Sequence, residues 1–408
     1  MTDVDRYAGA ERLAHALMFE GYVLYPYRRS SLKNMQRFSF GTLQQSARCV
    51  AGTSDSSSLR VECLVRGAAP AIDLSVRFLQ HVRRDDAGSV EPWIEAVERQ
   101  CDHEAIELGA LAGPGMPGLG SQSFEHAFPG EQRSADGCAR HSAELCAQLT
   151  LATERLEAEL FKLRIDVENT SDGEDALLGS LGSAHVLLRA SGGRFVSLLE
   201  PPSELAQHAG SCRSRGCFPV LVGPVGDGSE GRDDVMLASP IILYDRPAIA
   251  PESAGDFCDA TEIDEMLTLR VLTLTDAERS EAARTDEKSR AILERTFAQS
   301  EATTLALHGA RRSTDFAEPT LEPPSMASAT ARSFEPGDAV LIRPRKGGDV
   351  FDLALTGERA TVASIEEDFE GRLHYAVTVD ADPGRDLGAQ GMPGHRFFFS
   401  ADELERIA

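Results

Sequence analysis

Alternating apolar and polar positions dominate the first 170 residues of the chain. Residues 59–66 and 72–82 alternate on either side of a Gly-Ala-Ala-Pro break, a pattern that predicts two half-buried strands joined as a β-hairpin. Alternation returns over residues 148–170, whereas residues 7–19 and 93–99 carry apolar side chains at helical spacing. We therefore expect residues 1–170 to form a β-rich N-terminal domain with a leading helix.

Residues 171–309 combine segments that alternate as strands do with segments that have helical spacing. Strands are expected at residues 185–189, 195–199, 218–222 and 239–247, and a short helix at residues 175–182. Thr261 is a suitable N-cap for a helix over residues 262–267, and Thr275 with Glu278 has the spacing of a capping box for a second helix reaching about residue 299. The pattern predicts a mixed α+β central domain.

The composition changes after residue 309. Residues 310–332 are rich in Ser, Thr, Ala, Glu and Pro without periodicity, so we expect a linker at residues 310–333. From Phe334 onward, short alternating strands are separated by Gly, Pro and Asp turns, which predicts a small SH3-like β-barrel over residues 334–408. The expected fold class is α+β, with a β-rich N-terminal domain, a mixed α/β central segment and this C-terminal barrel.

Charge and cysteine usage restrict the partners and the compartment. The 408-residue chain has a net charge of −24, which repels phosphate backbones and anionic lipids, so we expect no nucleic-acid partner. The chain starts without a basic and then apolar run, and its apolar stretches are too short to span a bilayer, so we expect no membrane insertion and a cytoplasmic location. The eight cysteines form no C-x-x-C pair and are expected to stay reduced.

A basic, tyrosine-rich stretch near the N-terminus is unexpected in so acidic a chain. Arginines beside tyrosines are the side chains enriched at interface hot spots, so we predict that this stretch, together with a basic pair near the C-terminus, binds a partner. The predicted partner-binding residues are Tyr25, Tyr27, Arg28, Arg29, Lys33, Arg37, His395 and Arg396. Internal pairing of the N-terminal stretch with the acidic remainder of the chain is equally compatible with the pattern.

Two weaker patterns suggest metal ligands. Cys212 and Cys217 lie five positions apart beside His208, and the following segment is dense in carboxylates. The candidate ligands are Cys212, Cys217, Glu252, Asp256, Cys258, Asp259 and Glu262. A loop with incidental cysteines, and helix capping by the carboxylates, explain the same residues more simply. Because the sequence contains no P-loop, no Gly-x-Ser-x-Gly elbow and no His-Glu-x-x-His, we predict no catalytic residue and no cofactor.

Several peptides carry a family resemblance. They are residues 20–28 (EGYVLYPYR), 239–245 (SPIILYD), 249–253 (IAPES), 261–265 (TEIDE) and 393–399 (PGHRFFF), joined by residues 349–355 and 382–388. In these peptides the chain resembles an uncharacterised accessory family found with actinobacterial-type NiFe hydrogenases. The resemblance implies a maturation, assembly or chaperone role exerted by binding a hydrogenase subunit or maturation protein. The alternative is a metal-handling protein or enzyme of unknown chemistry that uses the Cys/carboxylate-rich central segment.

Overall fold

The chain divides into two compact units. The computed structural model describes residues 3–35, 39–87, 92–112, 120–135, 137–223, 233–250, 253, 255–260, 262–300, 334–344, 350–367, 373–386 and 394–407. The first unit comprises Met1–Ala51 and Asp55–His308, and the second comprises Gly52–Ser54 and Gly309–Ala408. The predicted linker at residues 310–333 lies outside the described ranges.

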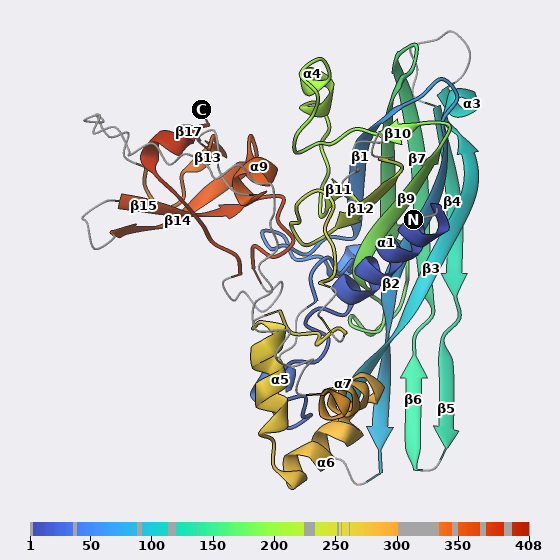
Figure 1. The fold of residues 1–408 in the computed structure, drawn as a ribbon, viewed down its shortest axis with the longest axis vertical. Helices are drawn as coiled ribbons and strands as arrows, with labels where there is room; N and C mark the ends of the chain where they lie inside the picture. Colours follow the sequence, from blue (N-terminus) through green and yellow to red (C-terminus); the bar gives the residue numbers. More distant parts are fainter. Residues whose placement is uncertain are drawn as a thin grey trace. The chain divides into compact units, whose positions relative to one another are not determined.

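Two antiparallel sheets build the first unit (Figure 1). The five-stranded sheet has the order β10-β1-β8-β7-β4. Its strands are β1 (Ser58–Arg66), β4 (Gly120–Phe128), β7 (Leu145–Glu157), β8 (Leu160–Asn169) and β10 (Arg194–Phe195). The seven-stranded sheet has the order β11-β12-β9-β2-β6-β5, and β3 pairs with the other edge of β2. Its strands are β2 (Ala71–Asp86), β3 (Trp93–Glu107), β5 (Glu131–Ala135), β6 (Cys138–Ser142), β9 (Leu181–Ser191), β11 (Phe218–Leu221) and β12 (Val235–Ser239).

The inner faces of the two sheets share one hydrophobic core. Val61, Leu149 and Ile165 of the five-stranded sheet are fully buried in one cluster with Val76 and Val186 of the seven-stranded sheet. The period-2 alternation of these strands places one set of side chains in the core and the other outside. Strands from both sides of residue 170 belong to these sheets, so the first two expected domains share one β-sandwich.

The strands predicted at residues 59–66 and 72–82 are present, but the predicted hairpin is wrong. β1 pairs with β8 and β10, whereas β2 pairs with β3, β6 and β9. The connection passes from one sheet to the other at Gly67, where a Cβ atom would lie 2.4 Å from the carbonyl oxygen of Gly192. The helical spacing of residues 93–99 also misleads, because pairing with β2 makes this segment part of β3.

Helices cover the outer face of the seven-stranded sheet (Figure 1). The leading helix is confirmed as α1 (Asp3–Met18), whose Ala10, Leu13 and Ala14 pack against Leu187 and Leu237. Further along the same face, a second cluster holds the buried side chains of α5 (Asp264–Leu272), α6 (Asp276–Thr285) and α7 (Glu287–Ala298). The short helical segments are α2 (Leu32–Met35), η1 (Ser46–Arg48), α3 (Leu108–Ala112) and α4 (Ala206–Ala209).

The capping box in the sequence marks a true helix start, but several predicted helix and strand boundaries differ from the structure. The capping box of Thr275 and Glu278 is present, with both reciprocal hydrogen bonds formed. The single helix expected to follow it is two helices, because Asp286 is extended (φ −161°) and caps α7 by accepting a hydrogen bond from the Ser289 amide (2.8 Å). The predicted helix at residues 175–182 forms turns followed by the start of β9, and β12 ends at Ser239, where the next predicted strand was to begin.

The second unit contains the third antiparallel sheet. Its order is β16-β15-β14-β13-β17. The elements are β13 (Ala339–Ile342), α9 (Val350–Leu355), β14 (Arg359–Glu367), β15 (Leu373–Val379), β16 (Phe397–Phe399), η3 (Ala401–Glu403) and β17 (Leu404–Arg406). Val340, Ile342, Val377 and Val379 are fully buried in this unit. The chain is therefore a β-rich α+β protein with three antiparallel sheets, as the sequence predicts. No helix in the described ranges is long and apolar enough to cross a membrane.

Candidate functional site

The tyrosines of the basic stretch hold a loop of the first unit. Tyr27 is fully buried with a left-handed backbone (φ 60°), and its hydroxyl donates to the carbonyl oxygen of Phe257 (3.1 Å). The amide of Tyr25 donates to Oδ2 of Asp259 (2.9 Å), and the guanidinium of Arg270 lies 5.5 Å from the Tyr25 ring centroid. These contacts fix residues 255–260 against the N-terminal segment.

The neighbouring arginines are paired within the chain. Nη1 of Arg28 lies 3.3 Å from Oε1 of Glu278, and Nη1 of Arg29 lies 3.2 Å from Oδ2 of Asp86. For these two side chains the structure shows the internal pairing that the sequence left open. Lys33 is exposed on α2, and Arg37 lies outside the described ranges. That the stretch contacts a partner stays a prediction.

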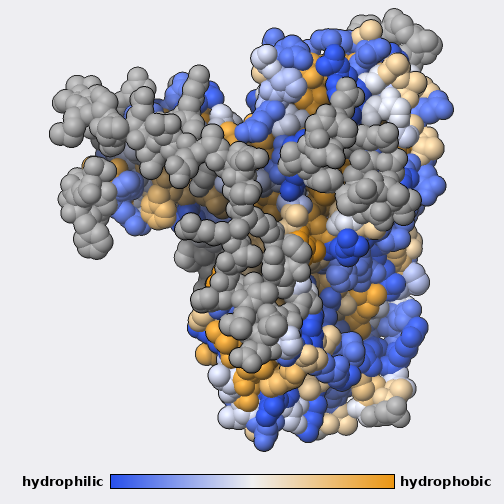
Figure 2. All heavy atoms as spheres, in the orientation of Figure 1, coloured by the Kyte–Doolittle hydropathy of each residue, from blue (hydrophilic) through white to orange (hydrophobic). Residues whose placement is uncertain are grey.

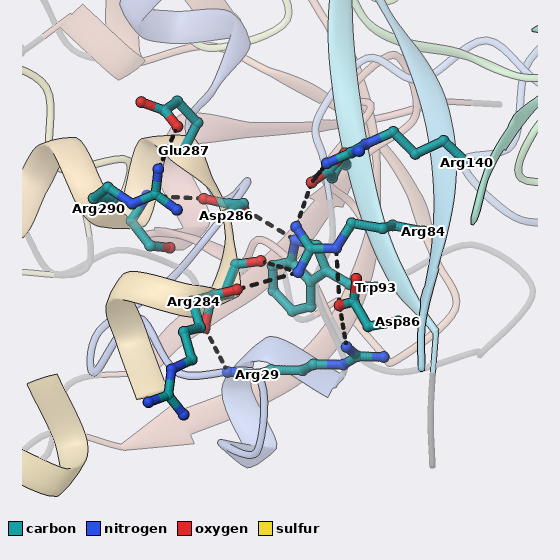
Figure 3. A network of polar contacts seen from close by, with 12 residues as sticks. Arg29, Arg84, Asp86, Trp93, Arg140, Arg284, Asp286, Glu287 and Arg290 are labelled. Atoms are coloured by element: carbon teal, nitrogen blue, oxygen red, sulfur yellow. Dashed lines mark hydrogen bonds and ion pairs between the residues drawn. The ribbon is translucent and has the colours of Figure 1, made fainter. Parts of the chain in front are cut away.

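Arg84 connects this stretch to the sheet and to the helices, as Figure 3 shows. Its Nε donates to Oδ2 of Asp86 (3.0 Å), its Nη1 pairs with Glu95, and its Nη2 donates to the carbonyl oxygen of Thr285 (2.7 Å). Arg29 shares the Asp86 carboxylate. Because Arg84 is almost completely buried, this network is a structural junction between β2, β3 and the end of α6.

The two candidate thiols at Cys212 and Cys217 lie beside backbone carbonyls. Sγ of Cys217 lies 3.2 Å from the carbonyl oxygen of Arg60, and Sγ of Cys212 lies 3.7 Å from that of His208. Burial raises the pKa of Cys212 to about 11 and that of Cys217 to about 12, although Lys162 and Arg213 oppose the first shift. The His208 ring pairs with Glu157 (3.3 Å). Both thiols are protonated near neutral pH, which weakens them as ligands and nucleophiles.

The candidate carboxylates have local partners. Asp256 accepts from the amide of Cys258 (2.7 Å), Asp259 accepts from Tyr25, and Glu262 pairs with Arg270. Glu252 lies outside the described ranges. Within the described part of the chain, no group of three or more His, Cys, Asp or Glu side chains is arranged to hold a metal ion. The alternative function therefore gains no ligand set from these residues.

Glu20 is an ionisable member of this region that the sequence reading missed. Its Oε1 accepts a hydrogen bond from the amide of Ala260 (2.6 Å). Burial, reinforced by the charges of Asp256 and Asp259, raises the pKa of Glu20 to about 7. Its position before a helix-ending glycine gave no hint of this, because the acidic neighbours lie more than 230 residues away in the sequence.

A serine and a histidine meet beneath the helix-covered outer face of the seven-stranded sheet. Oγ of Ser239 lies 3.2 Å from Nε2 of His185, whose Nδ1 lies 2.8 Å from the carbonyl oxygen of Ser183. The order of hydroxyl, imidazole and acceptor is that of a nucleophile with its base. Both side chains are fully buried, however, and burial lowers the pKa of His185 to about 4. The pair therefore serves packing and hydrogen bonding in the core.

In the second unit, the two predicted partner-binding residues are close together. His395 Nδ1 lies 3.0 Å from Oδ2 of the buried Asp382, and Nη1 of Arg396 donates to the carbonyl oxygen of Arg385 (3.0 Å). These contacts attach the residues before β16 to the turn at residues 380–386. They give His395 and Arg396 a structural role, and their predicted contact with a partner remains a prediction.

A cavity of about 510 Å³ and one of about 600 Å³ are present in the first unit. The larger one is lined by residues of α1, by Arg77 and by Ile249, Ser253, Gly255, Asp256, Phe257 and Asp264. Arg77 pairs with Glu11 and with Glu98 (3.2 Å), and Glu98 also binds Nδ1 of His15 (2.8 Å). The charges of Arg77, Glu11 and Glu98 therefore compensate one another at this cavity.

The most conspicuous surface feature is one half of α5, which sequence reasoning missed. Ile263, Met266, Leu269 and Leu272 keep 66%, 42%, 44% and 42% of their surface exposed. At 100° per residue Met266, Leu269 and Leu272 lie on the side of α5 opposite the buried Leu267 and Val271, and Ile263 precedes them as the extended N-cap. Figure 2 shows the resulting apolar surface at the lower left of the first unit. We call these four residues the α5 face.

Comparison with known proteins adds no family assignment. The chain matches no protein-family model, and no curated protein matches it.

Proposed function

We propose that this chain is a non-enzymatic, cytoplasmic accessory protein that helps to mature or assemble a NiFe hydrogenase by binding a hydrogenase subunit or maturation protein. The hydrogenase part of the proposal rests on the peptide resemblance. The binding part rests on one observation, the exposed apolar α5 face.

A helix whose apolar side chains extend beyond its core-facing stripe normally buries them against a further surface. Leu267 and Val271 are buried within the chain, whereas the residues of the α5 face keep about half of their surface exposed to water. Burial of the exposed part by a partner contributes roughly 1 kcal/mol per side chain. Four such side chains in one row are enough to form the centre of a modest interface.

The charge of the chain adds a preference for the partner. The net charge is −24, and the first turn of α5 carries Asp264 and Glu265. A partner surface with an apolar centre and basic residues around it complements both properties and associates faster at low salt. The proposed occupant is thus an apolar, basic-rimmed surface of a hydrogenase subunit or of one of its maturation proteins.

Co-purification from the native host tests the function. The wild-type chain and Leu269→Glu are tagged, purified gently from hydrogenase-expressing cells and compared by mass spectrometry. Leu177→Glu is the matched control, because Leu177 is the same residue type with the same 44% exposure as Leu269. Hydrogenase or maturation proteins should accompany the wild type and the control and be depleted with Leu269→Glu. If these proteins are absent from all three samples, the proposed role fails.

We also propose that the second unit closes into an SH3-like β-barrel. Two features support this topology: the C-terminal strand β17 returns to pair with the first strand β13, and the ladder of β14 with β15 shifts register between Val362 and Ser364. Such a bulge bends a strand and increases its twist, as a small barrel requires. A crystal structure of the whole chain in which β14 runs straight through Val362–Ser364 and the five strands form one flat sheet would contradict the proposal.

A further inference from the structure

Two histidines meet at the open edge of the β-sandwich. Nε2 of His103 lies 2.9 Å from Nε2 of His126. His103 is on β3, an edge strand of the seven-stranded sheet, and His126 is on β4, an edge strand of the five-stranded sheet. Figure 1 shows β3 and β4 side by side. β3 and β4 belong to different sheets and are not paired with each other, so the two histidines link the sheets through their side chains.

The surrounding side chains orient the first of these rings. The ring of His103 stacks on Phe124, with 3.6 Å between centroids and 24° between planes. Phe124 in turn packs against the sandwich core, two positions before His126 on β4. The stacked aromatic ring thus holds the imidazole of His103 toward His126, as a preorganised pair of ligands requires.

Each ring can offer one nitrogen to a metal ion, because a neutral imidazole has one protonated and one unprotonated nitrogen. Among the described residues, neither Nδ1 atom has a hydrogen-bond partner. The 2.9 Å contact is a hydrogen bond in which one Nε2 carries the proton, so metal binding requires that ring to move its proton to Nδ1 before both Nε2 lone pairs can face one ion.

The smaller cavity lies beside His103. It has a volume of about 510 Å³, and its lining includes His103, Gln122 and Phe124 but not His126. A cavity of this size admits several waters. Among the described residues no third His, Cys, Asp or Glu is placed to bind an ion together with the two histidines, so water would complete a coordination sphere that begins with two nitrogens.

We propose that His103 and His126 form an open site for a borderline divalent transition-metal ion such as Zn²⁺. Two imidazoles bound tetrahedrally at about 2.0–2.1 Å place their nitrogens about 3.3 Å apart, so the pair must open by about 0.4 Å. That movement breaks no ladder hydrogen bond in the described chain, since β3 pairs with β2 and β4 with β7. Imidazole selects Zn²⁺, Cu²⁺ or Ni²⁺ over Mg²⁺.

The site is independent of the proposed function. It uses neither the α5 face nor any of the candidate ligands suggested by the sequence. Its failure would leave the binding proposal unchanged, and failure of that proposal would leave the site unchanged.

Titration calorimetry with Zn²⁺ tests the site on the untagged, full-length chain. The wild type should bind one Zn²⁺, and His103→Gln and His126→Gln should each weaken binding at least about tenfold. His141→Gln is the matched control, because His141 is exposed on β6, which pairs with neither β3 nor β4, and this variant should bind like the wild type. Mg²⁺ should give no binding. Equal Zn²⁺ affinity in all four proteins, or no binding by the wild type, would overturn the proposal.

A second measurement avoids the substitutions. One equivalent of Cu²⁺ is added to the wild type, and electron paramagnetic resonance is used to count the nitrogens coupled to the copper. Two coupled nitrogens are expected for the His103–His126 site. A spectrum with fewer than two would overturn the proposal even if a histidine variant failed to fold.

Discussion

The indole Nε1 of Trp93 donates a hydrogen bond to Oδ2 of Asp286, with 3.0 Å between the atoms and 193 residues between the two positions. Trp93 begins β3, and Asp286 caps α7 through its other carboxylate oxygen, which accepts from the Ser289 amide. One buried carboxylate therefore stabilises a helix N-terminus and fixes that helix on the sheet (Figure 3). The helices α6 and α7 owe their placement to this contact and to the adjacent Arg84 network.

Replacing Asp286 should destabilise the first unit strongly. Asp286→Ala removes an N-cap, which costs about 1 kcal/mol, and leaves the buried Trp93 N–H without its partner, which costs a further 1–3 kcal/mol or so. Urea unfolding followed by tryptophan fluorescence measures the loss, since Trp93 is the sole tryptophan. Asp276→Ala, at an almost fully exposed carboxylate on α6, should change stability by less than about 0.5 kcal/mol. Equal effects of the two substitutions would argue against this junction.

The charge on Arg84 should matter less than its fork geometry. Arg84→Lys keeps a positive charge but cannot reach Asp86, Glu95 and the carbonyl of Thr285 together. Breaking a buried, multiply paired ion costs about 3–5 kcal/mol when one partner is removed, so we expect roughly 2 kcal/mol or more for the lysine variant. Arg290→Lys, in an exposed pair with Glu287, should cost less than about 1 kcal/mol. The urea unfolding midpoints of the two variants measure these losses. An Arg84→Lys variant as stable as the wild type would contradict the importance of the fork geometry.

Glu20 should make stability fall as the pH rises. Its pKa is raised from 4.5 to about 7, so between these values the native state retains a proton that the unfolded chain has released. The free energy of unfolding then decreases with pH, by roughly 3 kcal/mol in total for this group. Glu20→Gln stays neutral and keeps an acceptor for the Ala260 amide. Relative to wild type, the variant should therefore gain stability from pH 4 to pH 8 in urea unfolding, and a constant difference would refute the prediction.

His185 provides a control of opposite sign. Its pKa is lowered from 6.5 to about 4, so the unfolded chain binds a proton in this window that the native state does not. Its contribution to stability is lost as the pH falls from 6.5 to 4 and is fully present above 6.5. The free energy of unfolding of a His185→Gln variant should therefore differ from that of the wild type by less at pH 4 than at pH 7. A difference that stays constant with pH would mean that titration of His185 does not contribute to stability.

The sequence predicted the strands of this fold better than their pairing. Alternation identified β1, β2, β8 and the second-unit strands β13 to β16, because half-buried strands must place apolar residues at every second position. Pairing depends on the crossing at Gly67, where the close approach of Gly192 comes from a segment more than 120 residues away. The extended conformation of Asp286, which divides α6 from α7, likewise depends on Trp93. Such long-range contacts leave no local periodicity to recognise.

The candidate sites were harder to predict than the elements. The basic stretch stood out by composition, but its arginines face Glu278 and Asp86, which only the tertiary structure brings near. The three-residue spacing of Ile263, Met266, Leu269 and Leu272 was visible in the sequence. The exposure of these residues could not be predicted, because only the structure shows that Leu267 and Val271 are the residues of this helix that are buried in the core.

The most direct test of the central claim measures the affinity of the chain for a purified hydrogenase or maturation protein that co-purifies with it. We expect Leu269→Glu to raise the dissociation constant at least about tenfold, because it removes apolar burial and desolvates a charge. Leu177→Glu should leave the constant unchanged. Equal dissociation constants for the wild type and Leu269→Glu would show that the α5 face does not bind this partner and would contradict the account.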